Sequence, residues 1–162
     1  MHRVAQFVAH VRARVDAAEE ADARRVLPDA AWQLFARMPV ADRRHALDVV
    51  ARLRAAGDDD LDLVIAALLH DVAKGSRLRL WHRVAGVLLE AVAPSLLRRL
   101  ASDDAGSWRY PFHLYLHHGS LSADLAEWAG CPPRAVAFMR GTASGSGDVR
   151  LAHALKVADD AS

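Results

Sequence analysis

The segment LDLVIAALLHDVAKG, residues 61–75, restricts the fold of this chain more than any other stretch. Its spacing predicts a helix that is apolar on nearly every face until its last turn. A helix with no polar face belongs in the centre of a protein, enclosed by other elements. The preceding run 58–60, three aspartates, offers an N-cap and favourable negative charge, and Gly75 suits a helix end.

Helical periodicity recurs through most of the remaining sequence, and no stretch alternates with the period of two that a half-buried strand shows. Aromatic residues make up only 6% of a chain rich in alanine, leucine and arginine, which favour helices. We therefore predict an all-α bundle of about seven or eight helices. We expect Pro94 to interrupt one of them, and 102–111 and 141–148 to be loops. The predicted helices cover residues 2–25, 29–38, 40–56, 61–74, 80–92, 112–129, 133–140 and 148–160.

The length and net charge of the chain restrict the kinds of protein that it can be. A chain of 162 residues suits a single domain, and a net charge of +1 argues against an extended nucleic-acid surface. Cys131 is the single cysteine, so no intrachain disulfide can form. No signal peptide is visible, and the most apolar segment, 84–97, is too short for a membrane span. We expect a cytoplasmic protein, with an interfacial helix as the alternative for 84–97 because arginines flank it: Arg79, Arg83, Arg98 and Arg99.

Polar side chains interrupt the apolar faces at four places. His70 and Asp71 end the most hydrophobic helix, His45 borders the apolar stripe of the helix 40–56, and Asp159 borders that of the last helix. Burial of a carboxylate is costly unless a cation pairs with it, and either a divalent metal or an arginine could do so. Two histidines and two aspartates at the edges of buried faces on three helices favour a metal.

Three segments resemble the HD superfamily of metal-dependent phosphohydrolases. These are HALDVV at 45–50, AALLHDVAKG at 66–75 and LKVADD at 155–160. The resemblance covers residues 40–160 and implies an HD-like helical core there, with 1–38 as a helical extension packed on it in one domain. The family's metal ligands fall on His45, His70, Asp71 and Asp159, with Asp160 as the rival for the last position.

Some members of the superfamily, such as the bacterial diadenosine tetraphosphate hydrolases, use further histidines and hold two metals. Their pattern has a histidine, a glycine four residues later and a leucine three residues after that. It matches His82, and it matches His118 with Ser122 in the place of the glycine. We prefer His118, because it shares a helix face with Leu121, Leu125 and Trp128 and so points inward. The last histidine of that pattern is absent, and Arg140 stands near its place, so one or two metals remain open.

The chemistry that the resemblance implies is hydrolysis of a phosphoester by a water that the metal activates. Imidazole and carboxylate ligands suit Mn, Fe, Zn, Co or Ni. Asp71 and Lys74 would be catalytic, and the substrate would be a nucleotide or another small phosphorylated molecule. The alternatives are a non-catalytic HD domain, serving as a metal-stabilised binding or regulatory module, and a plain helical bundle; a homodimer also stays open. The residues expected to bind substrate are Lys74, Arg77, His117 and His118.

The assignment makes a geometric prediction. His45, His70, Asp71 and Asp159 should converge on one point, within about 2.0–2.3 Å of a common ion when metal is bound. His118 should approach the same point, and His82 should not.

Overall fold

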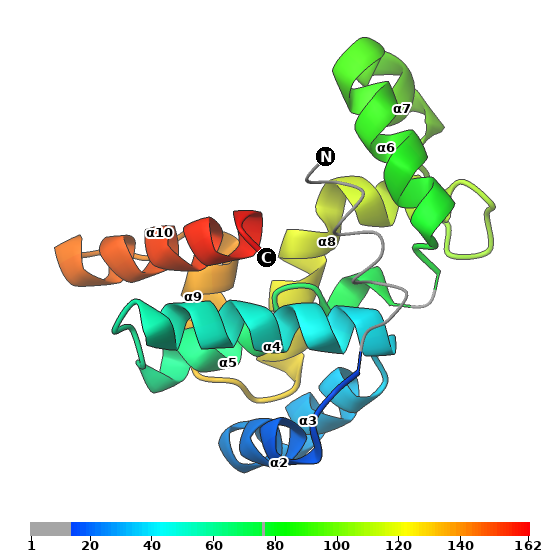
Figure 1. Cartoon of the computed structure of the whole chain (residues 1–162). Coiled ribbons are helices and arrows are strands. Elements are labelled where there is room, and N and C mark those ends of the chain that lie inside the picture. The colour runs from blue at the N-terminus through cyan, green and yellow to red at the C-terminus, as the bar shows by residue number, and fades with distance from the viewer. Residues whose placement is uncertain (1–13, 76) are drawn as a thin grey trace.

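The computed structural model describes residues 14–75 and 77–162. Within these ranges the chain is all-helical and has no strand, which confirms the predicted fold class. Nine α-helices and one short 3-10 helix lie in the described residues, close to the predicted seven or eight (Figure 1). Their bounds are α2 (Ala17–Val26), α3 (Asp29–Ala36), α4 (Val40–Ala55), α5 (Leu61–Leu69), η1 (Val72–Lys74), α6 (Leu80–Val92), α7 (Pro94–Leu100), α8 (Tyr110–Trp128), α9 (Pro133–Arg140) and α10 (Ser146–Asp160).

Helix α5 is the centre of the molecule. All seven residues from Leu63 to Leu69 are buried, and α5 packs against α2, α3, α4, α8, α9 and α10. Asp60 caps the helix, because its carboxylate accepts hydrogen bonds from the backbone N–H groups of Asp62 and Leu63 at 3.0 and 3.2 Å. Burial on all sides is what an apolar helix without a polar face requires.

Two helix boundaries differ from the predicted ones by more than two residues. Helix α5 ends at Leu69, and the chain continues as the 3-10 helix η1, whereas the sequence predicted one helix up to Gly75. The predicted helix 2–25 begins at Ala17 in the described residues, where Asp16 caps it, and 14–16 are not helical. Its first part, 1–13, lies outside the described residues.

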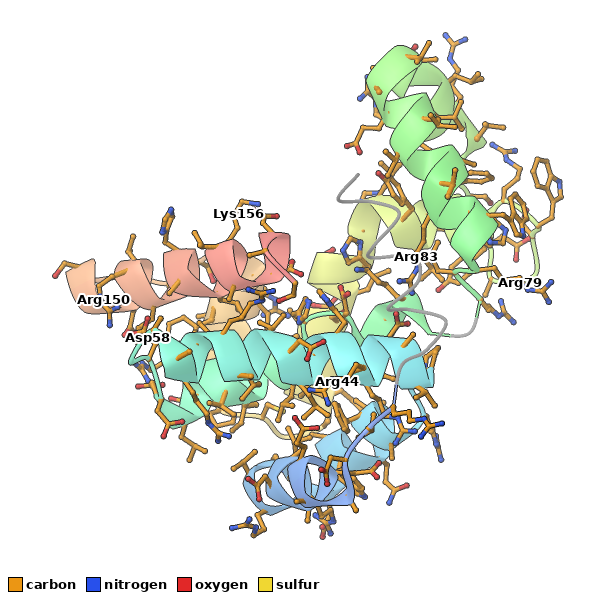
Figure 2. The ribbon with its side chains drawn as sticks, in the orientation of Figure 1. Arg44, Asp58, Arg79, Arg83, Arg150 and Lys156 are labelled. Atoms are coloured by element: carbon orange, nitrogen blue, oxygen red, sulfur yellow. The ribbon has the colours of Figure 1, made fainter. Side chains whose placement is uncertain are left out.

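Helices α6 and α7 form a hairpin that stands away from the other helices (Figure 1). The hairpin contacts α8, where Gly86 allows close approach: a Cβ at this position would lie 2.6 Å from the Tyr115 ring. On its inner side Arg83 donates two hydrogen bonds of 2.8 Å to the buried carboxylate of Asp42, and Figure 2 shows both the hairpin and this arginine. The Arg83–Asp42 ion pair and the contact with α8 thus hold the hairpin to the other helices.

Among the helices in the described part of the chain, none combines the length and the apolar character needed to cross a membrane.

Candidate metal centre

Two helices and the turn after α5 bring two imidazoles and two carboxylates together. His45 lies on α4, His70 and Asp71 follow α5, and Asp159 lies on α10. The Asp159 Oδ1 atom is 2.9 Å from His45 Nε2 and 3.3 Å from His70 Nε2. The Asp71 Oδ2 atom is 3.6 Å from His70 Nε2 and 3.8 Å from His45 Nε2. One ligand atom each from His45, His70 and Asp159 lies within 4.8 Å of the others, so this group could hold a metal ion.

His118 approaches the same carboxylate from α8. Its Nε2 atom is 3.7 Å from Asp71 Oδ1, on the other oxygen from the one that faces His45 and His70. The side chain of His82 lies elsewhere, beside Trp81 and Phe112. Of the two histidines that match the family pattern, His118 is therefore the one at the centre.

The backbone fixes the neutral tautomer of two of these rings. His70 Nδ1 is 2.8 Å from the Ala67 carbonyl oxygen, and His118 Nδ1 is 2.9 Å from that of Tyr115. A carbonyl oxygen can only accept, so each Nδ1 carries the proton and donates it. The Nε2 atom of each neutral ring then presents a lone pair to the centre, which is the form of imidazole that binds a metal.

The buried polar atoms of the cluster are a separate indication that it suits a cation. The Nε2 atom of His70 is buried and has no hydrogen-bond partner in the described residues. Asp71 beside it is only 2% exposed. A buried nitrogen without a partner is costly, and a divalent cation between it and the Asp71 carboxylate, which Lys74 already pairs, would satisfy it.

The pKa shifts within the cluster also indicate that it favours positive charge. Burial of His70 alone would lower its pKa, but the carboxylates of Asp71 and Asp159 outweigh burial and raise it. Burial would raise the pKa of Asp159, yet its hydrogen bond with His45 and the nearby imidazole of His70 hold it far below its usual value. For Asp71 too, His70 and then Lys74 outweigh burial and lower the pKa. Without a metal, protons on imidazole supply the charge that these carboxylates require.

A cavity of about 320 Å³ opens beside the cluster. Its wall includes His70, Asp71, His118 and Asp159, together with side chains of α9 and α10. Two basic residues, Arg140 and Lys156, also line it, although the sequence analysis gave neither a substrate role. Lys156 lies three residues before Asp159, a spacing that places both on one side of a helix. This spacing is visible in the sequence and could have identified Lys156 as a residue beside the site.

The remaining predicted substrate residues divide between the centre and other places. The Lys74 ammonium donates to Asp71, so it belongs to the cluster. The Arg77 guanidinium donates to the Ala105 carbonyl and lies over the Tyr110 ring, and it lines a different hollow. The ring of His117 lies 4.6 Å from that of His113, beside a third hollow that Arg98 and Arg109 also line.

Comparison with known proteins adds no relative. No protein-family model matches the sequence, no curated protein matches it, and no solved structure matches it. We therefore infer function from the geometry of the cluster and from the motifs of the sequence.

Proposed function

We propose that this protein is a metal-dependent phosphohydrolase of the HD type that acts on a nucleotide or another small phosphoester. The observation that carries the proposal is the unpartnered, buried Nε2 atom of His70, which faces two carboxylates alongside a second imidazole. Asymmetric sets of imidazole and carboxylate ligands are typical of catalytic rather than purely structural metal sites.

In this proposal, the residues of the cluster have the following roles. His45, His70 and Asp159 would hold one ion, with Asp71 as the fourth ligand and His118 within reach of a further position. A bound Mn, Fe, Co, Ni or Zn ion supplies a water of lowered pKa and a Lewis acid for the phosphoryl oxygen. His118 supports this role because burial and then the charge of Lys74 lower its pKa, so the ring is neutral at pH 7.

The substrate side of the centre is the 320 Å³ cavity, a volume at the lower end of the range for small-molecule sites. Lys74 uses one of its three N–H donors on Asp71 and has others for a phosphate oxygen. Arg140 supplies a second cation in the cavity wall, although Asp124 and Glu127 bind its guanidinium. We place the activity in the cytoplasm, where the one thiol, the buried Cys131, would stay reduced.

The test uses two neighbouring aspartates of α10. Asp159 contacts both imidazoles, whereas Asp160 is exposed and pairs with Lys156 at 3.4 Å. Purified protein, stripped of metal and reloaded with each of the five metals, is assayed on bis(p-nitrophenyl) phosphate and a nucleotide panel. We expect Asp159→Asn to lower kcat/KM at least 100-fold, about 2.7 kcal/mol of transition-state stabilisation, and Asp160→Asn to change it less than twofold.

The outcomes separate the competing functions. Metal binding at the Asp159 site without turnover of any substrate would favour the non-catalytic metal-stabilised module. No metal binding at all, by elemental analysis and thermal shift, would contradict both and leave a helical bundle with internally paired polar groups.

A further inference from the structure

A second hollow, of about 640 Å³, lies at the N-terminal end of α6. It shares no lining residue with the cavity of the metal centre. The side chains that matter here are two arginines, a histidine and three aromatic residues, and we call this hollow the α6 groove. They are Arg77, Arg79, Trp81, His82, Trp108 and Tyr110.

The charge of the α6 groove is positive. No acidic residue lines it, and neither Arg77 nor Arg79 forms an ion pair with a carboxylate in the described residues. The exposed Arg79 lies at the start of α6, as Figure 2 shows. The first N–H groups of a helix of this length also point out of its N-terminal end and carry partial positive charge. The groove is therefore suited to an anion.

His82 is an independent sign of a ligand. Only 6% of the residue is exposed, yet it lines the groove. Its Nδ1 atom accepts a 3.2 Å hydrogen bond from the backbone N–H of Arg79, so in the neutral ring the proton must be on Nε2. That N–H donor has no partner in the described residues.

The His82 ring is also fixed in position. The Trp81 ring lies 3.6 Å from it, centroid to centroid, and Phe112 meets it edge-on at 5.9 Å. Burial, and then the nearby charge of Arg79, lower the pKa of His82. The ring thus stays neutral at pH 7 and offers one oriented N–H donor rather than a diffuse charge.

Two large aromatic side chains of the groove lie in solvent. Trp81 is 55% exposed and Trp108 is 69% exposed. The exposed faces of these indoles can stack on a planar ring, which is worth about 1–3 kcal/mol per base in nucleic-acid binding. A ligand that uses every feature of the groove therefore carries both an anion and an aromatic ring.

We propose that the α6 groove is a separate binding site for a nucleotide. Its phosphate would accept hydrogen bonds from His82 Nε2, Arg79 and the N-terminus of α6, and its base would stack on Trp81 or Trp108. The volume of the groove is in the middle of the range for small-molecule sites. The proposal needs no metal and does not depend on hydrolysis at the metal centre.

The test is calorimetry on the full chain in the presence of a chelator, with AMP, adenosine and inorganic phosphate as probes. We expect AMP to bind at least tenfold more tightly than either adenosine or phosphate, because only AMP meets both parts of the groove. Equal binding of phosphate and AMP would overturn the proposal, as would no binding of AMP.

Two exposed positions allow variants that leave the interior intact. Arg79→Gln and Trp108→Leu should each weaken AMP binding about tenfold. Their controls are Arg52→Gln on α4 and Trp128→Leu at the end of α8, which are exposed and lie outside the groove. His82→Gln, which keeps a side-chain N–H donor, should bind AMP better than His82→Phe. Equal loss in the controls, or no loss in Arg79→Gln and Trp108→Leu, would overturn the proposal.

One further variant assigns the binding to its site. Asp159→Asn alters the metal centre and should leave AMP binding in chelator unchanged within twofold. A loss of binding there would mean that AMP occupies the cavity of the metal centre, which overturns the α6 groove as the site without contradicting the proposed function.

Discussion

At the scale of single residues, the imidazole of His70 can bind either a metal ion or a proton at the same nitrogen. Its backbone hydrogen bond to Ala67 directs Nε2 into the cluster, while the neighbouring carboxylates raise its pKa above the usual value. In the metal-free protein, a proton on this ring therefore competes with a cation for the same nitrogen.

This competition predicts that metal binding depends on pH. Because the pKa of His70 in the folded protein is raised, the ring holds its proton up to and beyond about pH 6.5, and metal binding there must release it. We expect affinity for Zn²⁺ or Mn²⁺ to fall by up to about tenfold for each pH unit below this pKa and to level off above it. Calorimetry at pH 6 and pH 8, in two buffers of different ionisation enthalpy, measures both the affinity and the protons released.

The control for this prediction is His153→Gln, which removes an exposed histidine of α10 and should leave the pH dependence unchanged. Affinity that is the same at both pH values, with no proton release, would show that His70 is not a ligand.

At the scale of elements, the contact between α6 and α8 depends on a missing side chain. A Cβ on Gly86 would lie 2.6 Å from the Tyr115 ring, whereas a Cβ on Gly119, within α8, would meet nothing within 4 Å. The same substitution should therefore have opposite effects. Gly86→Ala should lower the free energy of unfolding by about 1–3 kcal/mol through overpacking. Gly119→Ala should raise it by about 0.5–1 kcal/mol, because alanine favours a helix. Urea denaturation followed by circular dichroism measures both.

If both variants moved in the same direction, the close packing of α6 on α8 would not be the cause. The contact between α6 and α8 also includes a hydrogen bond, because the Tyr115 hydroxyl donates to the Glu90 carboxylate at 2.7 Å.

Patterns in the sequence were sufficient for most helices, and the exceptions have physical causes. Pro94 was expected to interrupt a helix, and no helix was predicted after it. In the structure it occupies the first position of α7, where its missing N–H costs nothing. Helix α5 was predicted to reach Gly75, but its regular part ends at Leu69 and a 3-10 turn follows. Periodicity does not separate an α-helix from a short 3-10 continuation, because the two differ in their hydrogen bonds.

The same limit applies to the site. The motifs placed His45, His70, Asp71 and Asp159 at the edges of buried faces, and the structure brings these side chains together. Charged surface residues were harder to assign. The sequence placed Arg83 among the arginines that flank 84–97, whereas the structure pairs it with Asp42, which is 41 residues away in sequence. Partners at such a separation follow from tertiary packing, which no local pattern contains.

At the scale of the whole molecule, the hydrophobic core and the hairpin are distinct. The main cluster of buried apolar residues runs over α2 to η1 and over the second half of α8 to α10, and no described residue between Val72 and Ala123 belongs to it. The cluster lies around the candidate metal centre, because α4 and α10 carry both core residues and candidate ligands and His70 directly follows the buried helix α5.

This arrangement predicts how bound metal stabilises the protein. At a free metal concentration about 100-fold above Kd, the free energy of unfolding should rise by about 2.7 kcal/mol. Hydrogen exchange followed by mass spectrometry should show slower exchange in α4, α5 and α10 with metal, and little change in α6 and α7. Exchange slowed equally in all helices, the hairpin included, would contradict a centre that ties only the core helices together.

The separation of hairpin and core also has a consequence for how such a protein can change over evolutionary time. Substitutions or insertions in the hairpin would meet few of the constraints that hold the core, since it contacts the body mainly through α8 and one buried ion pair. Residues 77–109 could therefore diversify rapidly while the candidate metal ligands stayed fixed. One inherited scaffold could then give rise to descendants that share a reaction and differ in the molecules that bind beside it.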